Sequence, residues 1–269
     1  MHPARKTLLA AGWGLMISVP APANAGRHAG LALIRNRKTF ALLMMLVGSA
    51  LAVASEVAVD VGHGIIDQGA ISARGKSEYL FNDRLARRLA GELPRRGLKV
   101  RPINFDGRIE SLPARPQQAA GTDFFISIHH DSVQPHLLRD WQWQGTPQTY
   151  SDDHAGFALF VSHDNPDLPT SLRCASAIGA RLRRLGFVPA RHHDDPSALK
   201  PRPAADADNA VYYYDKLVVL YKTTLPAVLF EAGVIKNRDE ERLLDDPDYQ
   251  GRMADAIATG IAACLYAGS

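Results

Sequence analysis

The chain has 269 residues, of which 46% are hydrophobic and 22% are charged, as in ordinary soluble globular proteins, and this length suits one sizeable α/β domain with additional segments. The net charge of +3 comes from the amino-terminal region, because six Lys and Arg residues but no Asp or Glu precede Ser55. The remainder holds 25 of the 31 basic residues against all 28 acidic ones. This nearly neutral body offers no basic surface, and we expect no nucleic-acid partner.

The amino-terminal region contains the three parts of a secretory signal. Basic residues at 35–38 precede an apolar run at 40–47, and Ala52-Val53-Ala54 follows as a small-x-small cleavage pattern. We therefore expect residues 1–54 to be a leader cleaved after Ala54, and the protein to be exported to the periplasm. A similar pattern at residues 5–25 leaves open which copy is used and where translation starts. The alternative is an uncleaved anchor, but the apolar stretch is shorter than the roughly 20 residues of a membrane span.

The first predicted strand ends close to a histidine. Residues 57–61 read Val-Ala-Val-Asp-Val, a short apolar run that fits a buried parallel strand. Gly62-His63-Gly64 follows, and glycines permit a tight turn that leaves the imidazole uncrowded. Functional sites of open α/β sheets form at the carboxyl ends of strands. His63 is therefore a candidate site residue, although a Gly-His-Gly turn on its own more often belongs to an ordinary loop.

Two helices and two strands are predicted next. Leucines at 80, 85, 89 and 93 recur near helical spacing and predict a helix over residues 77–95. Residues 98–103 read as a strand, and residues 108–120 as a helix interrupted by two prolines. Residues 123–129 form another apolar strand, which also closes on a histidine, His129.

The second half of the chain continues the alternation of strands and helices. Residues 132–153 are irregular and aromatic, and residues 188–209 form a long loop of a kind that is often functional. The other predicted elements are a strand at 156–162, a helix at 171–185, buried strands at 217–220 and 226–230, a short acidic helix capped by Asn237 and a final helix at 248–266. This order predicts an α/β fold, a mostly parallel twisted sheet with helices on both faces, in a single catalytic domain.

Polar side chains stand where three of the predicted strands end. His63, His129 and Glu231 follow apolar runs, and in a parallel sheet these ends lie along one edge. Glu78 joins them from the first turn of the helix after the His63 loop. Two imidazoles and one carboxylate form a catalytic zinc set that leaves a position for water. A further carboxylate nearby can act as a general base toward that water.

These residues also carry a resemblance to a known family. Asp60-Val61-Gly62-His63-Gly64, Glu78 at a helix start, Ser127-Ile128-His129, and Pro-Ala-Val-Leu-Phe-Glu-Ala-Gly at 226–233 with Asn237 beyond it occur in this order. With these motifs the chain resembles the zinc-dependent N-acetylmuramoyl-L-alanine amidases over about residues 57–265. The resemblance implies that His63, Glu78 and His129 bind one Zn²⁺ and that Glu231 is the catalytic carboxylate.

The resemblance implies a function for residues 55–269 as a zinc amidase catalytic domain. Such a domain hydrolyses the amide bond between N-acetylmuramic acid and L-alanine in peptidoglycan, with Glu231 as general base and acid. Peptidoglycan is then the expected partner, a protein activator stays open as another, and no stable membrane span is expected. Two alternatives also stay open: a non-catalytic peptidoglycan-binding or activator module on the same fold, and a zinc peptidase that cuts within the stem peptide.

The sequence departs from the family pattern at a few places. Val61 stands where proline is usual and His130 where a small residue is usual, and neither change removes a ligand. Alternation along a strand turns His130 away from His129. Segments 133–150 and 188–209 do not follow the common pattern, so substrate contacts there stay unassigned.

Other residues near the motifs have simpler interpretations. We expect Asp60 to orient a ligating imidazole and Arg115 to make a structural ion pair. The run His192-His193-Asp194-Asp195 could hold a second metal, but we favour a solvated loop.

The aromatic segment and the cysteines leave alternatives. Trp141 and Trp143 could line a sugar groove or fold onto the core. Cys174 and Cys264 lie on separate predicted helices, and sequence does not show whether they are close enough to pair. We favour two small buried side chains.

Overall fold

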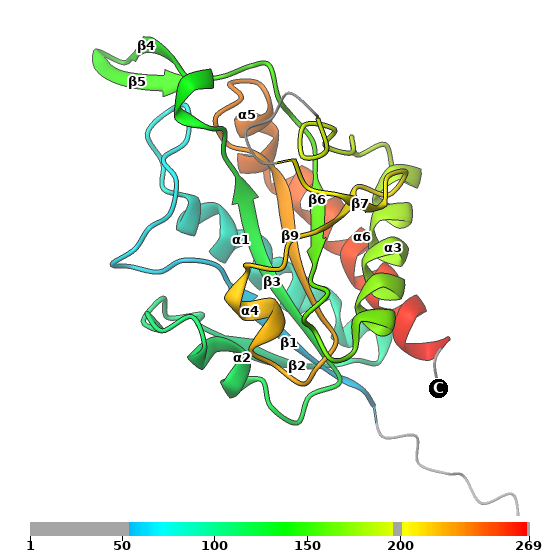
Figure 1. The fold of residues 1–269 in the computed structure, drawn as a ribbon. Coiled ribbons are helices and arrows are strands. Elements are labelled where there is room, and N and C mark those ends of the chain that lie inside the picture. Colours follow the sequence, from blue (N-terminus) through cyan, green and yellow to red (C-terminus); the bar gives the residue numbers. More distant parts are fainter. Residues whose placement is uncertain (1–53, 196–200, 268–269) are drawn as a thin grey trace, which may run out of the picture. The chain divides into compact units, whose positions relative to one another are not determined.

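The computed structural model describes residues 54–195 and 201–267 (Figure 1). The predicted leader, apart from Ala54, thus lies outside the described residues, as do residues 196–200 of the predicted long loop. None of the helices in the described ranges combines the length and the apolar composition that crossing a bilayer requires.

A sheet of seven strands forms the centre of the fold, in the order β2-β1-β3-β9-β6-β8-β7. β1 pairs in parallel with β2 and β3, β3 with β9, and β6 with β8, whereas β6–β9 and β7–β8 are antiparallel. The predicted α/β fold with a mostly parallel sheet is therefore confirmed. The strands are β1 (Glu56–Val61), β2 (Lys99–Ile103), β3 (Phe124–Asp131), β6 (Ala158–Val161), β7 (Ala204–Asp206), β8 (Val211–Tyr213) and β9 (Ala227–Val234).

Helices cover both faces of the sheet, as predicted, but unequally. Three long helices, α1 (Glu78–Glu92), α3 (Leu168–Arg184) and α6 (Pro247–Tyr266), pack side by side on one face, with α6 between the other two (Figure 1). The short helices α2 (Ala114–Gln118) and α4 (Val218–Tyr221) lie on the opposite face. Within residues 54–195 and 201–267, the remaining helical segments are α5 (Glu240–Asp245) and two 3₁₀ turns, Pro94–Arg96 and Pro135–Leu137.

The apolar face of α1 shows how the sequence pattern places the helices. Phe81, Leu85 and Leu89 recur every four residues and are fully buried against the sheet, as expected for one helical face. Leu80, which the leucine spacing assigned to this face, is 44% exposed, because Phe81 takes the core position. The helix ends at Glu92, before Pro94 and earlier than the predicted boundary.

Residues 217–220 do not form the predicted strand. They belong mostly to the helix α4, whose Val219 and Leu220 are buried. Both sides of β9 are already occupied, by β3 and β6, and both sides of β8 by β6 and β7. The sheet therefore has no free strand position beside β8 or β9, the strands that precede and follow this segment in the sequence. A four-residue apolar run fits a strand and a helix equally well, so the tertiary arrangement decided the outcome.

A hairpin occurs where irregular structure was predicted. β4 (Arg139–Trp143) pairs antiparallel with β5 (Thr146–Tyr150). The turn residues Gln144 and Gly145 have φ angles of 49° and 76°, the left-handed values that a type I′ turn requires. Glycine after a polar residue, between alternating aromatic and polar side chains, is the local signal for this turn.

Two other boundaries differ from the prediction. The helix expected at 108–120 shortens to α2, which begins directly after Pro113. β9 runs to Val234, so Glu231 lies within the strand and not after it. Asp239 and not Asn237 holds the N-cap position of α5. Asn237 lies two residues earlier, and its Oδ1 accepts hydrogen bonds of 3.0 Å from the N–H groups of Asp239 and Glu240.

A disulfide joins Cys174 of α3 to Cys264 of α6, with 5.0 Å between their Cα atoms. Our preference for two unpaired buried side chains is therefore wrong. The cysteines are 90 residues apart, and they meet because the two helices pack against each other on one face of the sheet.

Removing this cross-link should destabilise the fold. We expect Cys174→Ala/Cys264→Ala to lower the free energy of unfolding by about 2–5 kcal/mol, because a disulfide restricts the unfolded chain most when it closes a long loop. Urea denaturation measures the difference. A reductant should lower the wild-type value to that of the variant and leave the variant unchanged; equal stability of the two proteins under oxidising conditions would contradict the prediction.

Candidate functional site

The register of the parallel strands places three predicted site residues in a row. His129 of β3 is the partner of Glu231 on β9. On the other side of β3, Val61 pairs with Ile128, and the N–H of Gly62 donates to the Ile128 carbonyl at 3.0 Å. His63 therefore follows β1 next to His129. The polar edge predicted from the strand ends exists in the structure.

His63 has a left-handed backbone conformation, with φ of 62°, which is unusual for a residue other than glycine. Two buried side chains hold it there. Arg115 Nη2 and Asn104 Nδ2 each donate to the His63 carbonyl at 2.6 Å, and each also donates to the Val61 carbonyl. These hydrogen bonds over-determine the turn and so fix the direction of the imidazole.

Asp60 supports the same turn from within β1. Its carboxylate accepts a hydrogen bond of 2.6 Å from Ser127 Oγ and lies 3.4 Å from Arg115 Nη1. Burial raises the pKa of Asp60, although Arg115 and the hydrogen bond from Ser127 oppose the shift. Arg115 thus makes the predicted ion pair, whereas Asp60 hydrogen bonds to Ser127 and not to the ligating imidazole we expected.

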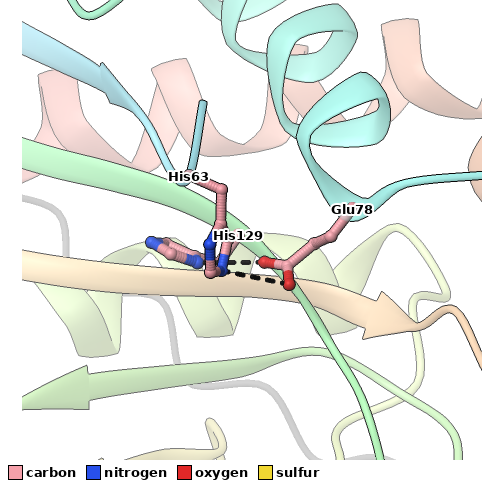
Figure 2. A group of neighbouring side chains, drawn as sticks. All are labelled: His63, Glu78 and His129. Carbon is pink, nitrogen blue, oxygen red and sulfur yellow. Dashed lines mark hydrogen bonds and ion pairs between the residues drawn. The ribbon is translucent and has the colours of Figure 1, made fainter. Parts of the chain in front are cut away.

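The Glu78 carboxylate faces the two neighbouring imidazoles of His63 and His129 (Figure 2). Its Oε2 is 3.2 Å from His63 Nε2, and its Oε1 is 3.0 Å from His129 Nδ1. The donor atoms of these three residues lie within 4.8 Å of one another. We call this group the His63–Glu78–His129 triad. It contains ligand types that zinc prefers, so the side chains fit a divalent metal.

Hydrogen bonds to the same carboxylate set its charge. Burial by itself raises the pKa of Glu78, but hydrogen bonds and charges from His129 and His63 outweigh burial and hold that pKa well below its usual range. Burial lowers the pKa of His63, but its hydrogen bond and charge interaction with Glu78 outweigh this and raise it overall. Glu78 is therefore ionised at neutral pH, as a metal ligand must be.

Glu231 is a half-buried carboxylate beside the triad. Its Oε2 is buried and has no hydrogen-bond partner. Burial, followed by the charges of Asp131 and Glu78, raises the pKa of Glu231 well above its usual value. With the triad and Asp131, Glu231 lines a shallow hollow. Such a side chain can hold or release a proton where a substrate would meet the triad.

Two glycines leave room for the side chains of the triad. A Cβ atom on Gly62 would lie 2.4 Å from Cε1 and Nε2 of His129, and one on Gly69 would lie 2.6 Å from Glu78 Oε2 and from His63 Cδ2. Real Cβ atoms do not approach other atoms so closely. The backbone can therefore pass beside the triad only where no side chain is present.

His130 faces the opposite side of β3, toward α1. Its ring packs against Phe81, and its Nδ1 lies 2.8 Å from Asn82 Oδ1. Burial lowers the pKa of His130 to about 3, so the ring is neutral. The strand alternation predicted this direction.

The tryptophans of the hairpin stack on each other and around arginines. Trp141 and Trp143 have ring centroids 5.5 Å apart, and Trp141 Nε1 donates to the Ala73 carbonyl at 2.9 Å. Arg74 lies over Trp143 at 4.8 Å. This cluster contacts the loop before α1 through Ala73 and Arg74, and neither tryptophan belongs to the buried core. Folding onto the core therefore does not describe these side chains, and the sugar groove stays a prediction.

Sequence reasoning missed two residues of this region. Asn104 directly follows β2, and Asp131 lies two positions after His129 on the same strand. His63 was selected as a polar residue close after a predicted strand, and Asn104 meets the same criterion. The two-residue period of a strand places Asp131 on the face of His129. Asp131 contacts His192 and His193, whose side chains are 14% and 13% exposed. The expected solvated loop is therefore wrong for these two histidines.

Comparisons with known proteins place the chain in a family. The family model described as N-acetylmuramoyl-L-alanine amidase matches residues 57–263. The chain belongs to this family. The predicted enzyme class, a peptidoglycan amidase, is thereby confirmed.

Individual relatives extend the comparison. "Uncharacterized protein YqiI" of Bacillus subtilis is 28% identical over 207 residues, which cover 76% of this chain and 82% of that protein. "Probable cell wall amidase LytH" of Staphylococcus aureus is 24% identical over 208 residues, which cover 76% of this chain but only 56% of LytH. The chain thus spans little more than half the length of the second relative.

Solved structures share the fold. The N-acetylmuramoyl-L-alanine amidase from Clostridium difficile 630 has a TM-score of 0.63 at 20% identity, covering 80% of this chain and 99% of that one. The CwlD amidase from Clostridioides difficile, solved in complex with the GerS lipoprotein, has a TM-score of 0.56 at 21% identity, covering 79% and 99%.

The space at Gly62 gives a direct test of the site. We expect Gly62→Ala to displace the His129 ring and to weaken Zn²⁺ affinity at least tenfold, because a buried overlap of this kind forces neighbours to shift at a cost of about 1–3 kcal/mol. Competition with a chromogenic chelator measures the affinity. Gly91→Ala is the matched control, since a Cβ there meets no atom within 4 Å and alanine favours the helix. Unchanged zinc affinity in Gly62→Ala would contradict the prediction.

Proposed function

We propose that the protein is a zinc-dependent enzyme that hydrolyses the amide bond between N-acetylmuramic acid and L-alanine, with Glu231 as general base and acid. The observation that supports this proposal best is the buried, unpartnered Oε2 of Glu231 beside the His63–Glu78–His129 triad. A carboxylate is costly to bury without a partner, and a reacting water or amine would supply one.

The triad would hold the metal. Two imidazole nitrogens and one carboxylate oxygen are the donors of a catalytic zinc site, and their mutual separation within 4.8 Å suits a single ion. When bound, zinc polarises a carbonyl group and lowers the pKa of a water molecule. Asn82 and the Ala70 N–H donate to Glu78 at 3.2 and 3.1 Å, and these bonds keep the carboxylate directed at both imidazoles.

Glu231 would transfer the protons of the reaction. With Oε2 free, the carboxylate takes a proton from the attacking water and gives it to the departing amine of L-alanine. Burial and the nearby carboxylates raise the pKa of Glu231, so the side chain keeps enough proton affinity for both steps. A cavity of about 530 Å³ next to Glu231, lined also by His63, His129, Leu112 and Leu217, offers space for the substrate.

Export and partners are part of this proposal. The Cys174–Cys264 disulfide suits an oxidising compartment such as the periplasm, as the leader predicted from residues 1–54 does. Peptidoglycan would be the substrate there. A protein activator stays within the proposal because the similar CwlD amidase was solved in complex with the GerS lipoprotein.

Product analysis tests the proposal. Purified peptidoglycan treated with the protein should release free stem peptides that begin with L-alanine and leave the glycan strands intact, as detected by mass spectrometry. A chelator should abolish these products and added Zn²⁺ should restore them. Shortened peptides still attached to muramic acid would indicate a peptidase instead. Binding to peptidoglycan without any release would favour the non-catalytic module.

Replacing Glu231 separates chemistry from metal binding. We expect Glu231→Gln to keep the zinc content of the wild type but to lower kcat by about 10²–10⁴-fold, because the amide cannot take up the proton. Glu92→Gln is the matched control, since Glu92 ends the helix that Glu78 begins, about 20 Å away at 1.5 Å per residue. Wild-type turnover in Glu231→Gln would refute the assigned role.

A further inference from the structure

A second group of ligand-type side chains lies outside the His63–Glu78–His129 triad. Asp131 Oδ2 is 2.8 Å from His192 Nε2 and 3.2 Å from His193 Nε2. One donor atom from each residue falls within 4.8 Å of the other two. Two imidazole nitrogens therefore converge on one carboxylate oxygen, although His192 is 61 residues from Asp131 in the chain.

Hydrogen bonding alone does not satisfy this group. His192 makes a hydrogen bond to Asp131, but His193 Nε2 is buried without a hydrogen bond despite its 3.2 Å approach to the same oxygen. A buried polar atom without a partner costs about 1–3 kcal/mol. An ion held by the two rings and the carboxylate would give His193 Nε2 a well-directed partner in addition to its ion-pair contact with Asp131.

The backbone before the histidines is firmly placed. The Phe157 N–H donates to the Val188 carbonyl at 2.9 Å, and the Ala190 N–H donates to the Phe157 carbonyl at 2.8 Å. The buried Tyr212 hydroxyl donates to the Ala190 carbonyl at 2.7 Å. The two imidazoles therefore start from a segment fixed against β6 and β8, which is the support that a metal site needs.

The second group borders the catalytic hollow. A cavity of about 290 Å³ is lined by Asp131, His192, His193 and His154, and also by Glu231. The hollow at the triad is lined by the triad itself and again by Asp131 and Glu231. Asp131 and Glu231 are thus shared by both spaces, and the second group is open to a small ion.

We propose that Asp131, His192 and His193 form a second zinc site that shares no ligand with the triad. Its two imidazoles and one carboxylate are the donor types that zinc takes. Ca²⁺ and Mg²⁺ prefer a set of oxygen ligands, whereas two of the three donors here are nitrogen atoms. The proposal depends only on these three side chains and stands whether or not the triad binds metal.

Metal counting on the full-length protein tests this directly. The protein is stripped with a chelator, loaded with Zn²⁺ alone, desalted, and its zinc per chain is measured by mass spectrometry. We expect two zinc ions in the wild type, one in His192→Ala/His193→Ala, one in His63→Ala/His129→Ala, and none when all four are replaced. His163→Ala is the matched control, since His163 pairs with Asp215 at 3.1 Å on the surface, and it should retain two.

The outcomes distinguish the two sites. One zinc in the wild type that His192→Ala/His193→Ala also retains would overturn the second site. One zinc that disappears only in His192→Ala/His193→Ala would support the second site and overturn metal binding by the triad. Two zinc ions in both the wild type and His192→Ala/His193→Ala would again overturn the proposal.

A second measurement covers the case in which the alanine variant misfolds. Asp131→Asn keeps the shape of the side chain but removes its charge, and it should weaken binding of the second zinc at least tenfold. In His63→Ala/His129→Ala, added Zn²⁺ should raise Tm, because a ligand that binds only the folded state stabilises it. The same addition should leave Tm unchanged when His192 and His193 are also replaced. Unaltered zinc affinity in Asp131→Asn, or no Tm shift in His63→Ala/His129→Ala, would refute the second site.

Discussion

Burial of carboxylates at one edge of the sheet is the constraint on which the rest of this site depends. A buried charge is tolerated only where it is paired and hydrogen-bonded. Asp60 is compensated by Arg115 and Ser127, Glu78 by two imidazoles, and Asp131 by two more. Glu231 alone among these four keeps a buried oxygen without a partner. The uncompensated carboxylate is the one to which chemistry is assigned.

The compensating groups also determine shape. Arg115 and Asn104 hold the His63 carbonyl and so keep a non-glycine residue at positive φ. The same arginine balances the charge of Asp60, whose carboxylate also accepts a hydrogen bond from Ser127 of β3. The same side chains thus compensate a buried charge and hold the strained backbone in place. Together these interactions fix the direction of the His63 imidazole. A scaffold this interdependent suits a site that must place a metal ligand accurately.

The candidate site could be predicted because its signals are local. His63, His129 and Glu231 each follow an apolar run, and the rule that parallel strands share one carboxyl edge brings them together. The resemblance to the amidase family rests on the same residues. The position of Glu231 within β9 was not predicted, since strand boundaries depend on how far neighbouring strands continue. The structure extends β9 because β3 also continues to Asp131.

The sequence by itself determined the α/β class, the parallel strands and the candidate triad with Glu231, because side-chain periodicity and strand-end position act over a few residues. Only the tertiary structure decided the helix at 218–221, the disulfide between Cys174 and Cys264, and the meeting of His192 and His193 with Asp131. Each of these depends on which elements occupy neighbouring positions in space. Some of these contacts join residues that are 61 or 90 positions apart in the chain. Such contacts leave no periodic pattern in the sequence, because they arise from the packing of the folded structure.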